Sequence, residues 1–257
     1  MKNEKRKKIV RTSLLIISGS IFIFSVYNLV LIYFTYLAID RLNTEIQVTY
    51  TTPITSPDSD YTTVEDNGKL AIDWENLLRR NSDVIGWILI PNTNINYPIL
   101  QGETNQTYLH TNINGDHSIA GSIFMQANNN PLFQDTNTIL HGHNMRNNSM
   151  FADLNRIARR RIEMPSHVHI YLPDGRLKLY RVASVNQIDI NSALYNSSIK
   201  TLQDYLELFR QGSVSNINFN RDNIERILTL STCRGLSSTT PLRTVLYAYL
   251  EQEIMLP

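Results

Sequence analysis

The chain contains one cysteine, Cys233, at the end of the apolar run ILTLSTC, and its thiol is a candidate nucleophile. A thiol becomes reactive as a thiolate, which a neighbouring imidazolium or guanidinium favours. His143 closes an earlier β-type run and Arg243 begins the next one, so the three side chains could converge at one rim of a barrel. Acyl transfer would also need fixed donors for a developing oxyanion. The alternative is that Cys233 packs as an inert small hydrophobe, and spacing alone leaves both interpretations open.

Four histidines form two His-x-His pairs, which raise the rival hypothesis of a metal site. His141 and His143 form one pair, and His167 and His169 form the other. Residues two apart on a strand point to one face, and imidazole is a common zinc ligand. However, no Asp or Glu completes either pair at close spacing, and half-exposed structural histidines are the simpler expectation for the run HVHIYL. We therefore predict no metal, and a metal-dependent hydrolase, which chelators would inactivate, stays an alternative.

The charge distribution predicts a protein tied to a membrane. The formal net charge of +1 over 257 residues is too balanced for a typical nucleic-acid-binding protein. Residues 1–11 are strongly basic, and residues 12–39 contain no charged side chain. That apolar stretch is long enough to cross a hydrocarbon core of about 30 Å, and too long for a cleaved signal peptide, the alternative. Because Lys and Arg concentrate on the cytoplasmic side of a span, we predict a single-pass anchor with a cytoplasmic N-terminus and an extracytoplasmic domain.

The remaining sequence predicts mainly β structure. Residues 40–68 are rich in Thr, Ser, Asp and Pro and have the composition of a linker. Asp73 is a candidate N-cap for a short helix that ends near Asn81. Short runs separated by turn residues predict a β-barrel or sandwich, and a helix over residues 198–211 interrupts them. The runs are 84–90, 94–100, 121–126, 137–143, 167–172, 176–188, 226–232 and 244–250.

Several segments, in order, resemble the sortases, the cysteine transpeptidases of Gram-positive bacteria. TLSTC, followed by the arginine of PLRTVLYAYL, resembles their C-terminal signature, and GHNM with MFADL resembles their histidine motif. VIGWILIPNTNINYPILQG and TYLHTNINGDHSIAGSIFM are similar to the class B branch in particular. The resemblance extends over roughly residues 70–252. It implies a closed β-barrel of about eight strands, with an N-terminal helical segment and a helix inserted between two late strands.

The resemblance also implies a division of the chain and roles for single residues. His143 matches the catalytic histidine, Cys233 the nucleophile, and Arg243 the arginine that binds the sorting signal and the oxyanion. Ser231 and Leu109 match substrate-binding positions that line the groove. The implied segments are a cytoplasmic tail (1–11), a transmembrane signal anchor (12–39), an extracytoplasmic linker (40–68) and the catalytic domain (69–257).

Two features depart from the commoner class B pattern. His141 stands where class B enzymes often have Tyr, and we expect it to be structural or a rim residue. Arg234, Gly235 and Leu236 stand where many class B sequences have an aromatic and an acidic residue. The second departure weakens any inference about substrate preference.

The implied function is that of a membrane-anchored cysteine transpeptidase without a cofactor. It would cleave a threonine-containing sorting signal, resembling NPxTx or xPxTG, on secreted proteins through a thioester acyl-enzyme. The expected acceptor is the amine of a lipid-linked peptidoglycan precursor of the cell wall, because nothing in the sequence specifies a pilin lysine. Pilin polymerisation is the alternative within the family. A membrane-anchored binding module, in which Cys233 is buried and unreactive, is the alternative outside it.

Overall fold

The computed structural model describes residues 2–54, 69–189, 214–215, 224–233 and 241–256, and divides the chain into two compact units. The first unit, residues 1–44, contains most of helix α1 (Lys2–Tyr50). Among the described residues this is the one helix long and apolar enough to cross a membrane. Several of its hydroxyl groups bond within the helix, as Ser20 Oγ does to the Ile16 carbonyl at 2.9 Å. This internal pairing suits a helix in apolar surroundings, where water is not available to its polar groups.

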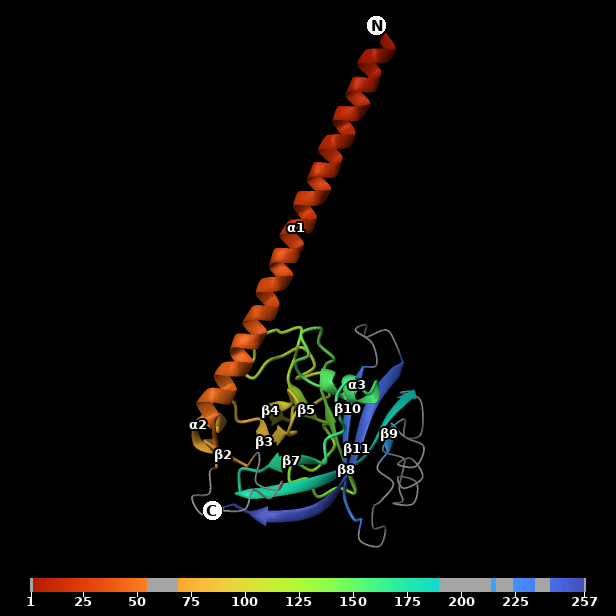
Figure 1. Ribbon diagram of the computed structural model, residues 1–257. Coiled ribbons are helices and arrows are strands. Elements are labelled where there is room, and N and C mark those ends of the chain that lie inside the picture. The colour runs from red at the N-terminus through yellow and green to blue at the C-terminus, as the bar shows by residue number, and fades with distance from the viewer. Residues whose placement is uncertain (1, 55–68, 190–213, 216–223, 234–240, 257) are drawn as a thin grey trace. The chain divides into compact units, whose positions relative to one another are not determined.

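The second unit, residues 45–257, is a closed mixed β-barrel (Figure 1). The described strands follow the order β11-β10-β6-β5-β4-β3-β7-β8-β9, and pairing of β8 with β11 closes the barrel around eight of them. Strands β4 and β5, and strands β6 and β10, pair in parallel, whereas the other pairs are antiparallel. The predicted eight-stranded barrel is confirmed. The strands are β3 (Val84–Leu89), β4 (Asn96–Leu100), β5 (Ile123–Met125), β6 (Asn137–His141), β7 (His167–Tyr171), β8 (Arg176–Asp189), β9 (Val214–Ser215), β10 (Ile227–Cys233) and β11 (Leu242–Met255).

Large aromatic side chains fill the interior of this unit. Trp87, Tyr180 and Tyr247 are completely buried, each on a different strand. Burial of one large apolar side chain contributes roughly 1.5–3 kcal/mol, so these rings supply much of the driving force for closure. Trp87 also donates its Nε1–H to Asn96 Oδ1 at 2.7 Å, which satisfies the polar atom of the indole.

The described residues that precede the barrel strands, 40–54 and 69–72, include helical and extended segments. Residues 40–50 continue α1, and β1 (Thr51–Pro53) pairs with β2 (Leu70–Ile72) in an antiparallel ladder. Ile46 and Tyr50 are buried in the second unit, and Arg80 pairs with Glu45 at 2.8 Å. Residues 45–50 therefore pack as part of the second unit. The proposed division into anchor, linker and catalytic domain stays a prediction.

Two further helices lie in the described part of the second unit. α2 (Trp74–Arg80) confirms the predicted short helix, and its N-cap Asp73 accepts from the Asn76 amide at 3.2 Å. α3 (Ala152–Ala158) lies between β6 and β7 and was not predicted. The predicted helix over residues 198–211 lies outside the described residues.

Candidate active site

Cys233 and Arg243 lie opposite each other at one end of the barrel. In the antiparallel ladder of β10 and β11, Cys233 pairs with Arg243. The amide of Gly142, just after β6, donates to the Ser231 carbonyl at 3.2 Å, so this carbonyl points away from β11. Carbonyls two residues apart on a strand point to the same side, and therefore the Cys233 carbonyl also points away from β11. Cys233 and Arg243 consequently form a non-hydrogen-bonded pair, in which side chains on one face approach most closely.

His143 follows β6 at the same end of the barrel. β6 runs parallel to β10 with His141 in register with Ser231, so His143 and Cys233 each lie two residues beyond this pair. At Gly142 the chain leaves the sheet. A Cβ atom there would lie 2.5 Å from the Ile123 side chain and 2.8 Å from the Phe151 ring, so glycine allows both side chains to pack closely against the main chain just before His143.

Two neighbours, together with burial, define the protonation of the His143 ring. Its Nε2 lies 2.7 Å from the Leu109 carbonyl, and because a carbonyl can only accept, Nε2 carries the proton. In the neutral ring Nδ1 is therefore the atom that can take up a proton. The His110 ring stacks on His143 with centroids 5.3 Å apart. Burial lowers the pKa of His143 below its ordinary value, and the charge of His110 lowers it further, against the opposing effect of the bond to Leu109.

His141 has a different environment that suits a structural role. Its ring stacks on Phe124 at 5.2 Å, and its Nε2 lies 3.4 Å from Gln126 Oε1. Burial, and then the positive charge of Arg243, lower the pKa of His141 to about 4. A ring with this pKa is neutral at pH 7 and is a poor proton donor there. His141 therefore lies beside the predicted catalytic arginine as a neutral packing group.

The two His-x-His pairs do not form one cluster. Strands β6 and β7, which carry them, are separated by three strands in either direction around the barrel. His167 instead lies with its Nε2 2.7 Å from the Glu251 carboxylate, and His169 is buried in β7. Within the described ranges, no group of three His, Cys, Asp or Glu side chains is placed to hold a metal ion.

The two residues predicted to line the substrate groove, Ser231 and Leu109, differ in how far they are exposed. The Ser231 side chain, on β10, is only 2% exposed. Leu109 is partly exposed and contributes its main-chain carbonyl to His143. The barrel thus brings all five predicted site residues to one end, although their roles in substrate binding stay predictions.

Sequence reasoning missed two residues that contact this site. His110 stacks on His143, and the amide of Asn155, on α3, donates to the Cys233 carbonyl at 2.9 Å. The apolar residues of MFADLNRIA recur with helical spacing and could have indicated α3. No local pattern could have indicated the contact with Cys233, because 78 positions separate the two residues.

Comparison with known proteins agrees with this geometry. The sequence pattern of the sortase domain matches residues 88–251. Sortase B of Listeria monocytogenes is 35% identical over 179 residues, which cover 68% of this chain and 72% of the relative. The structure of a Staphylococcus aureus sortase B–substrate complex is 30% identical with a TM-score of 0.58, over 71% of this chain and 85% of that one. A class B sortase involved in pilus biogenesis in Streptococcus pyogenes is 26% identical with a TM-score of 0.62, over 70% and 98%. The resemblance first noted in the motifs is confirmed, and the chain belongs to the sortase family as a cysteine transpeptidase of the class B branch.

Proposed function

We propose that this sortase is anchored in the membrane and joins secreted proteins to the cell wall through a thioester on Cys233. The observation that carries this proposal is the pairing of Cys233 with Arg243 on neighbouring strands. His143 enters the same end of the barrel from β6. A thiol, an imidazole and a fixed guanidinium are the groups that nucleophilic acyl transfer requires.

The proposed reaction has two acyl-transfer steps. The thiolate of Cys233 attacks the scissile carbonyl of a threonine-containing sorting signal, and Arg243 stabilises the oxyanion of the tetrahedral intermediate. The C–N bond then breaks, and the His143 imidazolium gives its proton to the departing amine. Because its pKa is lowered, the imidazolium is a stronger acid than an ordinary histidine and gives up this proton readily. An acceptor amine next attacks the thioester, loses a proton to His143 and releases Cys233. Ser231 and Leu109 would line the peptide groove.

Membrane attachment favours transfer over hydrolysis. α1 would cross the membrane with the basic residues 1–11 in the cytoplasm, which places the barrel outside. The sorting-signal protein and a lipid-linked peptidoglycan precursor would then share one surface with the enzyme, which raises their effective concentrations. A pilin amine is the second candidate acceptor, because the similar Streptococcus pyogenes enzyme is involved in pilus biogenesis.

The test is to incubate the full-length protein in detergent with a panel of sorting peptides and look for an acyl adduct on Cys233 by mass spectrometry. Oligoglycine and a lysine-containing pilin peptide, added separately, would distinguish the two acceptors. His143→Ala should abolish the adduct and His141→Ala should reduce it only mildly, and the reverse order would mean that the histidine roles are exchanged. A folded wild-type protein that forms no adduct with any peptide, and whose thiol resists alkylation, would overturn the proposal.

A further inference from the structure

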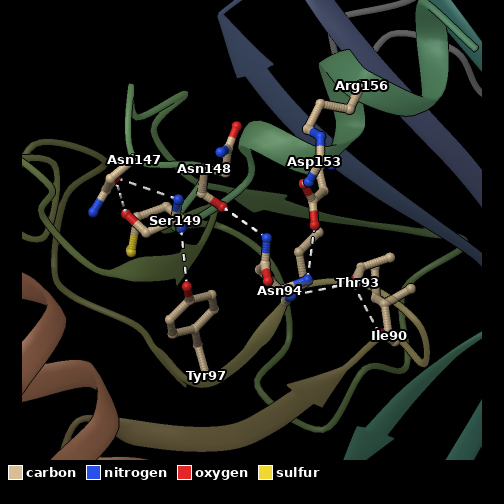
Figure 2. A network of polar contacts seen from close by, with 11 residues as sticks. Ile90, Thr93, Asn94, Tyr97, Asn147, Asn148, Ser149, Asp153 and Arg156 are labelled. Atoms are coloured by element: carbon tan, nitrogen blue, oxygen red, sulfur yellow. Dashed lines mark hydrogen bonds and ion pairs between the residues drawn. The ribbon is translucent and has the colours of Figure 1, made fainter. Parts of the chain in front are cut away.

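Helix α3 is held firmly beside the active site by polar contacts at its start. Asp153 is almost completely buried, and its carboxylate accepts from the Asn94 amide at 2.7 Å and from Arg156 Nη1 at 2.8 Å. Figure 2 shows Asp153 pointing toward Asn94. Just before the helix, the Met150 amide donates to the Tyr97 hydroxyl at 3.1 Å. Both Asn94 and Tyr97 belong to the β3–β4 region of the barrel. The helix is therefore anchored to the barrel wall independently of β10.

The position of Asn155 on this helix compensates for an interruption in the sheet. Up to Ser231, the side of β10 that faces β6 is paired, and the last bond comes from the Gly142 amide. The next carbonyl on that side belongs to Cys233, but β6 has already turned away at Gly142. Asn155 Nδ2 donates to this carbonyl at 2.9 Å. The Asn155 side chain thus supplies the hydrogen bond that β6 would have made to Cys233 if the strand had continued beyond Gly142.

The other atom of the same amide is also engaged. Thr244 Oγ1, which is fully buried on β11, donates to Asn155 Oδ1 at 2.7 Å. A flipped amide would direct its oxygen at the Cys233 carbonyl, which can only accept, so the orientation of Asn155 is defined. Asn155 is 5% exposed, and water cannot readily replace either bond. One side chain therefore ties the main chain of Cys233 to the residue that follows Arg243.

We propose that Asn155 is a positioning residue that holds the Cys233 main chain so that the thiol faces its catalytic partners. This inference rests on the proposed role of Cys233 as nucleophile. Without the Asn155 donor, the end of β10 keeps its ladder to β11 but loses its support on the other side. A displacement of about 1 Å at a reacting atom can cost about a hundredfold in rate. Loss of the donor should therefore lower kcat by roughly tenfold to a hundredfold and leave KM nearly unchanged.

The experiment compares Asn155→Leu and Asn155→Asp with Asn129→Leu in the full-length protein. Asn129 is a matched control because its amide also donates to a main-chain carbonyl, that of Asn137, at 3.0 Å. This bond is made to the first residue of β6, at the other end of that strand from the active site. We expect all three variants to lose thermal stability, but only the two Asn155 variants to lose kcat. An equal loss of kcat per folded molecule in Asn129→Leu would overturn the proposal.

The aspartate variant supplies a readout that a purely structural role would not move. A protonated carboxyl can donate to the Cys233 carbonyl as the amide does, whereas an ionised one cannot. The ratio of Asn155→Asp to wild-type kcat per folded molecule should therefore rise as the pH falls, while the ratio for Asn155→Leu stays constant. A ratio for Asn155→Asp that does not change with pH would overturn the proposal. This test needs only the aspartate variant, so it can be made even if the leucine variant does not fold.

Alkylation of Cys233 by iodoacetamide separates this inference from the proposed function, because it needs no peptide substrate. We expect Asn155→Leu to change the alkylation rate and its pH dependence, and Asn129→Leu to leave both at wild-type values. If wild-type protein forms no thioester but Asn155→Leu alters alkylation, the proposed function fails and the positioning role stands. If wild-type protein forms the thioester and Asn155→Leu changes neither kcat nor alkylation, the positioning role fails alone.

Discussion

Acidification should destabilise the barrel through His141, with a defined sign and pH window. The pKa of this side chain is lowered from 6.5 to about 4, first by burial and then by the charge of Arg243. Between these values the unfolded chain binds a proton that the folded chain does not. The free energy of unfolding therefore decreases as the pH is lowered. The loss begins near pH 6.5 and is complete near pH 4. Because a pKa difference of one corresponds to about 1.4 kcal/mol, lowering the pKa from 6.5 to about 4 limits the total loss from this group to about 3.5 kcal/mol.

Urea unfolding of the full-length protein at about pH 7.5 and about pH 4.5, followed by circular dichroism, measures this loss. His141→Gln retains a polar side chain that does not titrate, and we expect it to lose roughly 2 kcal/mol less than wild type between the two conditions. Other titrating groups contribute equally to both proteins, so the difference isolates His141. Arg243→Gln removes the second cause of the lowered pKa and should give an intermediate loss. Equal losses in wild type and His141→Gln would refute the reasoning.

Three further substitutions test the site. Cys233→Ala should abolish the thioester detected by mass spectrometry and leave the thermal unfolding temperature nearly unchanged, and residual adduct would place the nucleophile elsewhere. Arg243→Lys should lower kcat at least about tenfold in the peptide-cleavage assay, because an ammonium group cannot present the planar fork of a guanidinium; near-normal kcat would remove its oxyanion role. Gly121→Ala should destabilise the fold by roughly 1–3 kcal/mol in urea unfolding and reduce activity. Gly121 has φ 55°, and its added Cβ would lie 2.4 Å from the Leu109 carbonyl that orients His143. Unchanged stability and activity in this variant would show that the carbonyl can move freely.

Local sequence patterns predicted the strands well because each run carries its own β propensity and ends at turn residues. Local sequence patterns did not indicate two helical segments whose structure depends on tertiary packing. The composition of residues 40–50 did not indicate a helix, yet they continue α1, and Ile46 and Tyr50 are buried in the barrel unit. Helix α3 is only seven residues long, and its start is stabilised by contacts of Asp153 with a distant turn rather than by a capping side chain.

The sequence by itself indicated the type of molecule. It contains a basic segment followed by a long apolar stretch, eight β-type runs, and a single thiol within motifs that resemble the sortases. Tertiary structure decided which residues meet. The parallel pairing of β6 with β10 and the antiparallel pairing of β10 with β11 bring His143, Cys233 and Arg243 to one end of the barrel. It also decided that His141 is neutral and that Asn155 supports Cys233. Hydrogen bonding and desolvation depend on neighbours that are distant in sequence, and only the closed barrel brings those neighbours together.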